Sequence, residues 1–270
     1  TELQRVFAGS RCYVFFKIKN GLLKDCLTKT NSDTRGDITI DRPKAARHRD
    51  RGDIDVAGQF SVFGQIYRAL ISRSNREYRN AERVYTVKYR GEASIDAGGP
   101  YNETMSNMCN ELQSSYLRLL VPCPNNVHNI GENRESWIIN PAADTPQDLE
   151  LFTFLGKLMG CAIRTQNNLN LSLPPLFWKR LFMDPLSIKD LRGSDVCIVQ
   201  ILEILRNPSD NQLTPDNFAY AYDEKFTTKD SSGREVELIP DGKEKQVTFH
   251  NAGEYADLIE KYRLNENPKA

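Results

Sequence analysis

Residues 152–182 read FTFLGKLMGCAIRTQNNLNLSLPPLFWKRLF and form the densest apolar stretch of the chain. In the first half, apolar side chains recur at the three- and four-residue steps of an α-helix, which predicts one buried face. Gly156 and Gly160 leave a bare patch on which another backbone can pack closely. We therefore expect a core helix whose buried stripe consists of Phe152, Leu155, Gly156, Met159 and Ile163.

The second half of this stretch changes its period. The alternating leucines of residues 169–173 predict a short strand. The pair Pro174-Pro175 predicts the start of another helix, because proline is favoured in a first helical turn. The apolar side chains of that helix are Phe177, Trp178 and Leu181.

The composition favours a globular protein with no strong charge. The 270 residues could form one large domain or two smaller ones, and 39 % hydrophobic residues can fill a core. Because 36 basic residues balance 36 acidic ones, no whole-chain field attracts nucleic acid or an anionic membrane. The longest apolar run, residues 151–163, contains Lys157 and is shorter than the roughly 20 residues of a membrane-spanning helix. We expect neither a nucleic acid nor a membrane as partner.

The six cysteines are scattered, without a CxxC pair, and the N-terminus lacks the pattern of a secretory leader. This predicts reduced thiols and a cytoplasmic or nuclear protein. Cys109 and Cys161 fall inside apolar helical patterns, so we expect them in the core.

The first 58 residues are the least informative part. Residues 13–16 (YVFF) could form a strand or a buried helical turn, and periodicity cannot decide over so short a span. Residues 28–58 are polar and include RPKAARHRDRGD at 42–53, which predicts a solvated loop or an exposed helix. A nucleic-acid patch is the sharper alternative, but aspartates interleave with the arginines and no aromatic residues accompany them.

The middle of the chain predicts alternating helices and strands with recognisable caps. Residue patterns predict three helices, which begin at Ser61, at Gly98-Gly99-Pro100 and at the capping box Thr145–Asp148. They also predict strands at 84–89 and 137–139 and a polar surface loop at 121–136. The helix that follows Pro100 keeps its apolar spacing as far as Leu120, so we expect it to end just before Pro122.

Beyond Phe182 the predicted elements are short. They are a capped turn at 187–191, a helix from Asp195, a strand at 218–222, a hairpin pairing 235–239 with 246–249, and a helix capped by Asn251. The helix from Asp195 is apolar on more than one face, so it is either buried or binds a partner.

Catalytic and metal-binding patterns are missing from the sequence. His48, His128 and His250 are isolated, and there is no HExxH, no GxSxG and no Walker lysine. We therefore predict no cofactor and no metal. From the residues alone, the sequence predicts an α+β domain and no more.

Three segments resemble the HECT domain of ubiquitin ligases. Residues 87–103 (VKYRGEASIDAGGPYNE) are similar to its Gly-Glu, Asp-x-Gly-Gly and trailing Glu signature. Residues 152–181 resemble its following helix, strand and helix, and residues 233–264 resemble its hairpin and Asn-x-x-Glu-Tyr helix. The resemblance covers roughly 84–264, and residues 38–49 and 61–70 resemble the start of the domain in large HERC-type ligases.

The resemblance implies a function. HECT ligases accept ubiquitin from a conjugating enzyme on a cysteine and pass it to a substrate lysine, and the cysteine lies in a C-terminal lobe. Residues 1–58 are then an N-terminal extension with a charged loop, and residues 59–270 a partial, mainly helical N-terminal lobe. Within it, about 183–250 form a smaller mixed α/β subdomain that docks the charged conjugating enzyme. Protein substrates would bind through regions outside this chain.

The chain also departs from the family pattern. Only NENPKA follows Leu264, so we expect the C-terminal lobe to be absent and the chain alone to be inactive. Cys109, Cys161 and Cys197 lack the family's Thr-Cys-Phe context, so we assign no catalytic residue. Asn102 stands where the family usually has arginine, so we expect the turn before Glu103 to lose an ion pair. The alternative function is a shortened, non-catalytic module that binds conjugating enzymes.

The family's docking groove is apolar and transfers to this chain by motif position. The resemblance assigns it to Ile198, Ile201, Leu202, Tyr220, Tyr255 and Ile259. The competing interpretation is that these residues pack the subdomain's own core, and we favour that interpretation for the neighbouring Leu205, Phe218 and Leu258.

Overall fold

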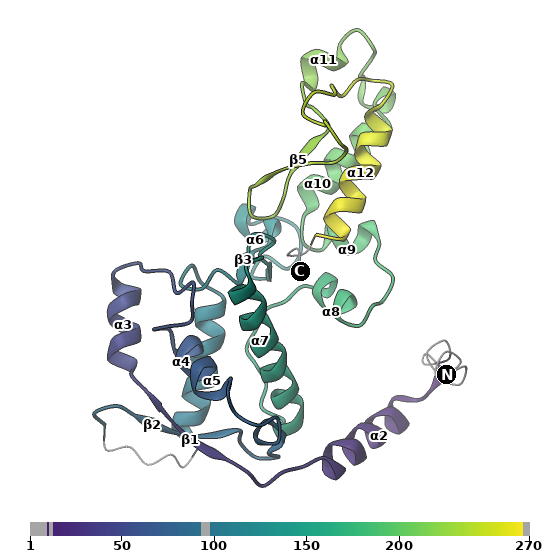
Figure 1. Ribbon diagram of the computed structural model, residues 1–270. Helices are drawn as coiled ribbons and strands as arrows, with labels where there is room; N and C mark the ends of the chain where they lie inside the picture. Colours follow the sequence, from purple (N-terminus) through teal and green to yellow (C-terminus); the bar gives the residue numbers. More distant parts are fainter. Residues whose placement is uncertain (1–9, 11–12, 93–97, 267–270) are drawn as a thin grey trace.

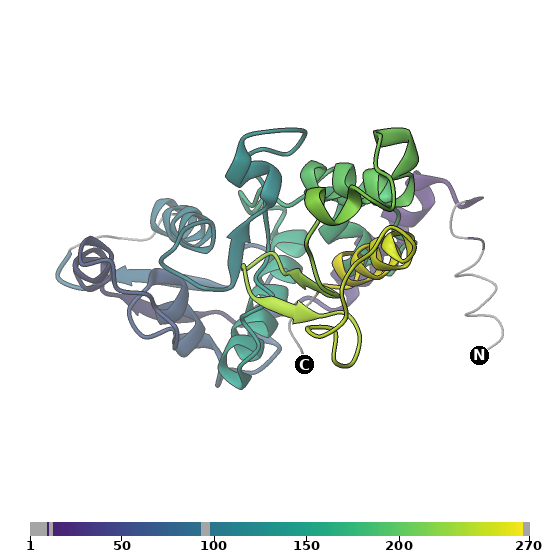
Figure 2. The same cartoon turned by 90° about the horizontal axis from the view of Figure 1, so that it is seen from above.

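The computed structural model describes residue 10, residues 13–92 and residues 98–266. Within this part the chain is mixed α+β and mostly helical, with three two-stranded sheets, as predicted. Its buried apolar side chains form two separate clusters. We call the part around the first cluster (Ile38 to Cys161) the large module and the part around the second (Leu191 to Ile259) the small module; Figures 1 and 2 show them as neighbouring bodies.

The helices are α2 (Phe16–Lys29), α3 (Arg42–Asp50), α4 (Val62–Leu70), α5 (Gly99–Leu112), α6 (Pro124–His128), α7 (Pro146–Thr165), α8 (Pro175–Leu181), α9 (Ile188–Arg192), α10 (Val196–Arg206), α11 (Phe218–Ala221) and α12 (Ala252–Leu264), with short 3-10 turns at Glu77–Arg79 and Ser209–Asn211. The strands are β1 (Gly36–Ile40), β2 (Tyr85–Tyr89), β3 (Leu120–Pro122), β4 (Trp137–Ile139), β5 (Thr227–Lys229) and β6 (Glu235–Glu237).

The polar N-terminal segment contributes a strand to the large module. β1 pairs in parallel with β2, with Gly36 opposite Tyr85 and Ile40 opposite Tyr89. Ile38 and Ile40 are buried because they face the core at alternate positions. The sequence did not predict this strand, since two isoleucines in a charged segment are a weak signal. α3, which follows, is the exposed helix that was one of the two predicted alternatives.

Two buried carboxylates hold the start of α4. The predicted cap is confirmed, because the Ser61 side chain accepts a hydrogen bond from the Gly64 amide. The Glu111 carboxylate accepts hydrogen bonds from the Val62 and Phe63 amides at 2.9 and 2.8 Å. Asp55 accepts from the Ser61 amide at 2.7 Å. These contacts satisfy amides that have no partner within the helix.

α5 is shorter than predicted. Gly98 has a φ of +112°, which suits glycine, and the helix begins at Gly99 and ends at Leu112 rather than near Leu120. Leu120 instead begins β3, which pairs antiparallel with β4. The apolar spacing continued into the strand because Leu117, Leu119 and Leu120 are buried in the same core.

The loop expected at 121–136 contains helix α6. Its Asn125 is buried and donates hydrogen bonds to the carbonyls of Glu132 and Arg192. A polar residue in this segment therefore packs inside, because its amide can satisfy carbonyls from two chain segments.

α7 begins at the predicted capping box of Thr145 and Asp148. Its buried side is rotated from the predicted stripe, since Ile163 is 57 % exposed and Phe152 and Met159 are only half-buried. The side chains that are buried are Leu151, Phe154, Leu155, Leu158 and Cys161, together with the carboxylate of Asp148.

The interpretation of Gly156 and Gly160 as a close-packing patch is wrong for the described residues. A Cβ added at either glycine would meet no atom within 4 Å. Residues 169–173 are likewise not a strand, although their leucines pack partly buried against the large module. The Trp137 amide donates to the Ser172 carbonyl at 2.8 Å, which is a single contact and not a ladder.

Two predictions in the small module are wrong. Residues 218–221 form α11 rather than a strand, because a hydrogen bond from the Phe218 amide to the Thr214 carbonyl starts a helical turn. β6 pairs with β5 and not with residues 246–249. The Asp230 side chain closes the β5–β6 turn by accepting from the Ser232 and Arg234 amides, each at 2.9 Å.

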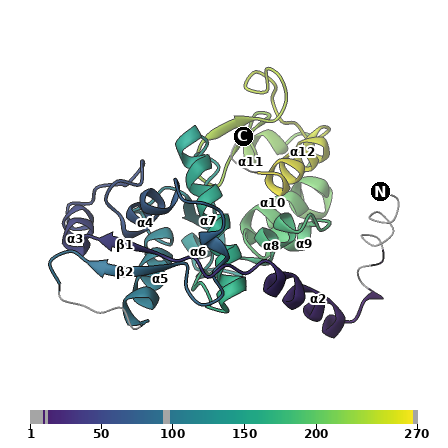
Figure 3. The same ribbon diagram turned by 60° about the horizontal axis from the view of Figure 1, so that its bottom comes forward.

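α2 lies apart from both modules (Figure 3). It has no buried residue, and Phe15 and Phe16 are exposed, so the segment 13–16 is neither a strand nor a buried turn. Its end is attached to α7, since Arg164 donates to the Leu27 carbonyl and to the Thr30 hydroxyl at 2.6 and 2.8 Å.

Candidate functional site

A hollow of about 540 Å³ lies between the small module and the β3–α6 segment. α10 and α12 form one wall, and β5 with the β5–β6 turn forms another. The apolar side chains that line it include Ile198, Ile201, Tyr222, Tyr255 and Ile259, with Val127 from α6.

Four of the six residues assigned to docking line this hollow, namely Ile198, Ile201, Tyr255 and Ile259. Ile198 and Ile201 are half-buried, whereas Tyr255 and Ile259 are buried and form its floor. Leu202 is 0 % exposed and packs in the small module's core. Tyr220 is 93 % exposed on α11 and is not among the lining residues. Docking on these residues stays a prediction.

Leu205, Phe218 and Leu258, which were predicted to pack the subdomain's own core and not to dock a partner, do contribute to that core. Leu205 and Phe218 are buried in the core of the small module, and Leu258 packs partly buried against it. Tyr222 lines the hollow but was not predicted to do so. The resemblance assigned Tyr220 to docking, whereas in the structure Tyr220 is exposed on α11 and Tyr222, at the end of α11, lines the hollow.

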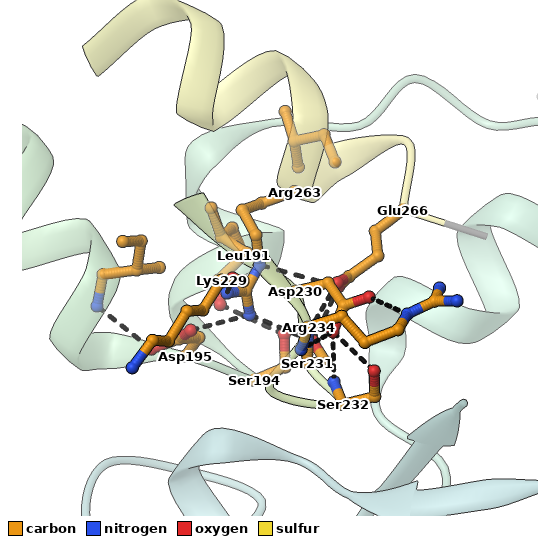
Figure 4. Close-up of polar contacts among 12 residues, drawn as sticks. Leu191, Ser194, Asp195, Lys229, Asp230, Ser231, Ser232, Arg234, Arg263 and Glu266 are labelled. Atoms are coloured by element: carbon orange, nitrogen blue, oxygen red, sulfur yellow. Dashed lines mark hydrogen bonds and ion pairs between the residues drawn. The ribbon is translucent and has the colours of Figure 1, made fainter. Parts of the chain in front are cut away.

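A buried ion pair joins the two helices of the apolar wall (Figure 4). The Arg263 guanidinium near the end of α12 donates to the Asp195 carboxylate at 2.8 Å, and each side chain is only 7 % exposed. Asp195 also caps α10 by accepting from the Ile198 amide at 3.0 Å. The pair therefore fixes the position of α10 relative to α12.

The same guanidinium reaches the β5–β6 turn. Arg263 donates to the Lys229 carbonyl at 3.3 Å and to the Ser231 hydroxyl at 3.1 Å (Figure 4). Glu266 accepts from the Ser231 amide and hydroxyl, both at 2.6 Å. One arginine thus connects the two walls of the hollow.

The turn is also connected to the large module. Arg234 donates to the Asp230 carboxylate at 2.9 Å and to the Pro141 carbonyl at 2.5 Å, and lies 3.4 Å from Asp144. Arg180 of α8 donates to the Leu264 carbonyl at 2.7 Å. Oriented polar contacts of this kind hold the two modules in one relative position.

Among the described cysteines, three are buried in environments that disfavour a thiolate. Burial raises the pKa of Cys109 and Cys123, and raises that of Cys161 to about 11. Cys161 and Cys109 are therefore core residues, as predicted. Cys26 is exposed and Cys197 is half-buried at the hollow. Cys12 lies outside the described residues.

The signature turn before α5 falls partly outside the described residues, but Glu103 is described. It accepts a hydrogen bond from the Tyr89 hydroxyl at 2.9 Å and forms an ion pair with Arg42 at 2.5 Å. Asn102 therefore does not leave Glu103 without an ion pair, since Arg42 of α3 supplies one.

No group of three or more histidine, cysteine, aspartate and glutamate side chains in the described ranges could hold a metal ion. In the same ranges, none of the helices has both the length and the apolar character needed to cross a bilayer.

A second hollow, of about 400 Å³, lies between α7, α8 and β4. It is mostly apolar, and Phe152, Gly156 and Met159 of α7 line it. The side of α7 that the sequence predicted to be core therefore faces a groove.

A family model and similar curated proteins indicate the same family. The model of the HECT domain (ubiquitin-transferase) matches residues 106–270. E3 ubiquitin-protein ligase HERC2 of Mus musculus is 35 % identical over 230 residues, which cover 85 % of this chain and 5 % of that protein. HERC2 of Homo sapiens gives the same identity and coverage. Human probable E3 ubiquitin-protein ligase HECTD4 is 27 % identical over 272 residues, 92 % of this chain and 7 % of its own. The chain thus spans only a small part of the curated relatives it matches.

Proposed function

The chain belongs to the HECT-domain family of ubiquitin transferases, and from that membership we propose that its small module docks a ubiquitin-conjugating enzyme. The observation that carries the proposal is the hollow bounded by α10 and α12. Half-buried Ile198 and Ile201 offer an apolar surface at its edge, and Tyr255 and Ile259 form a firm floor. A concave apolar surface with polar surroundings suits the loop of a transient partner.

The two-module construction supports an assignment to the N-terminal lobe. The small module has its own core around Leu202 and Phe226, separate from that of the large module. In this proposal the small module is the docking subdomain and the large module is the scaffold that carries it. Residues of α12 then belong to the docking subdomain, because Tyr255 and Ile259 pack in its core.

We further propose that transfer chemistry is not carried by the cysteines described here. A thioester-forming cysteine needs an accessible thiolate. Cys109, Cys123 and Cys161 are buried with raised pKa values, and the more accessible Cys26 and Cys197 lack the family's Thr-Cys-Phe context. The chain by itself then acts by docking, whether it works within a longer ligase or as a separate binding module.

The docking proposal is tested with Ile201→Ser, measured as the dissociation constant for a conjugating enzyme charged with ubiquitin. We expect binding to weaken by about tenfold or more, because a polar side chain replaces an apolar one on the surface that the partner would contact. Ile204→Ser is the matched control, since Ile204 lies on the same helix, is 37 % exposed and does not line the hollow. Equal binding by Ile201→Ser, with an unchanged circular dichroism spectrum, would remove the proposed site.

The proposal on chemistry has a separate test. Incubation with charged conjugating enzyme is expected to give no dithiothreitol-sensitive ubiquitin adduct on this chain. An adduct that disappears in Cys197→Ser or Cys26→Ser would show that one of the accessible cysteines carries the thioester.

A further inference from the structure

The hollow of the small module has a charged side as well as an apolar one. Its lining includes the carboxylates of Asp195, Glu224, Asp230 and Glu235. Arg263 pairs with Asp195, and Arg234 pairs with Asp230. Glu224 and Glu235 are both exposed. Among the described residues, neither side chain forms an ion pair or a side-chain hydrogen bond. Two unpaired carboxylates therefore remain at the rim of the hollow.

The basic residues of the lining offset this charge only in part. Arg263 is committed to Asp195. Lys229, the other lysine or arginine among the lining residues, lies opposite Glu235 in the β5–β6 pair, so Glu224 is the rim carboxylate with no basic lining residue paired opposite it. Glu224 lies close to the apolar wall, since its charge adds to burial in raising the pKa of Tyr222 to about 12. An acidic rim thus borders an apolar floor.

We propose that the hollow selects conjugating enzymes whose docking loop carries a lysine or arginine beside its apolar tip, with Glu224 and Glu235 receiving that cation. The apolar tip would fill the space over Tyr255 and Ile259. This inference rests on the proposed docking function and names the chemistry of the partner. Exposed rim charges act mainly by steering association and by rejecting partners of like charge.

The test compares Glu224→Gln/Glu235→Gln with the wild-type chain, using a conjugating enzyme that binds the wild type. We expect the double variant to bind about threefold to tenfold more weakly at low salt, mostly through slower association. The difference should shrink at high salt, because salt screens exposed charges. Glu244→Gln is the matched control, since Glu244 is an exposed carboxylate of the same module outside the hollow.

A charge exchange identifies the contact. Replacing the basic loop residue of the conjugating enzyme by glutamate should weaken binding to the wild-type chain. Glu235→Lys in this chain should restore part of that loss. Rescue of this kind requires the two charges to meet and does not follow from a purely structural role.

Three outcomes would overturn the inference. Unchanged affinity and salt dependence in the double variant, with Ile201→Ser still defective, would reject the charge selection and leave docking intact. Unchanged binding in both variants would reject docking and the inference together. Concentration-dependent self-association of the wild type that is lost in the double variant would assign the hollow to a second copy, whose exposed α2 carries both lysines and apolar side chains.

Discussion

Arg263 and Asp195 form an ion pair with 2.8 Å between Nη2 and Oδ2, and both side chains are 93 % buried. The two residues are far apart in sequence, at the end of α12 and at the cap of α10. Since α10 and α12 carry the apolar wall of the hollow, this pair adds to the apolar packing that holds the wall together.

Removal of one partner of this pair should be costly. We expect Arg263→Met to lower the free energy of unfolding by about 3–5 kcal/mol, because Asp195 would be left buried without its counter-charge. Urea denaturation measures the change. Arg206→Met is the control, since the pairs of Arg206 with Asp257 and Glu260 are more exposed and should contribute about 0–1 kcal/mol. Equal losses in the two variants would contradict this ranking.

Glu111 predicts a pH dependence of stability. Burial raises its pKa to about 7 from an ordinary 4.5, and the amides of Phe63 and Val62 oppose the shift. Because the folded state holds this proton more tightly, its contribution is fully present below about pH 4.5 and is lost as the pH rises through 7. The total effect is on the order of 3 kcal/mol.

Glu111→Gln removes this titration. The free energy of unfolding of the wild type minus that of the variant should therefore fall between pH 5 and pH 7, as measured by urea denaturation across that range. A difference that stays constant with pH would show that Glu111 does not titrate in this window.

Gly156 and Gly64 should respond in opposite ways to alanine. A Cβ at Gly156 meets no atom within 4 Å, so Gly156→Ala should stabilise α7 by about 0.5–1 kcal/mol through helix propensity. A Cβ at Gly64 would lie 2.4 Å from the backbone of Gly58, so Gly64→Ala should cost about 1–3 kcal/mol. Melting temperatures of the two variants check this. Destabilisation by Gly156→Ala would mean that another segment packs against that glycine.

Tyr255 combines a buried ring with a specific hydrogen bond. Its hydroxyl donates to the Thr227 carbonyl at 2.7 Å, which connects α12 to β5. Tyr255→Phe keeps the ring and should cost about 1–2 kcal/mol, because it leaves a buried carbonyl unsatisfied. Tyr255→Ala should cost about 3–5 kcal/mol through the cavity it creates. Thermal unfolding that ranks the two equally would show that the ring contributes little.

The cysteines should differ sharply in reactivity. Cys161 is buried, its thiol donates to the Tyr78 carbonyl, and its pKa is raised to about 11, so it should react with a thiol reagent only when the protein unfolds. Cys26 is exposed and should react at once. Mass spectrometry of partly labelled protein separates the two sites, and early labelling of Cys161 would contradict its assignment to the core.

Several local elements of this chain were determined by residues close together in its sequence. The capping box at Thr145 and Asp148, the cap of α4 at Ser61 and the alternation of β2 each depend on residues close together in the chain, and each is confirmed. The family was recognisable for the same reason, because its signatures are local motifs such as residues 87–103.

Only the tertiary structure decided which partners these elements have. The sequence could not show that β1 pairs with β2, that β5 rather than residues 246–249 pairs with β6, or that α7 leaves Phe152 and Met159 at a groove. The hollow likewise depends on tertiary packing, since Arg263 and Asp195 meet only when α10 and α12 pack together. Local hydrogen bonds and side-chain period favour a helix or a strand, whereas pairing and burial depend on what the rest of the chain places against the segment. Residues 169–173 and 218–222 therefore alternate in sequence without forming strands.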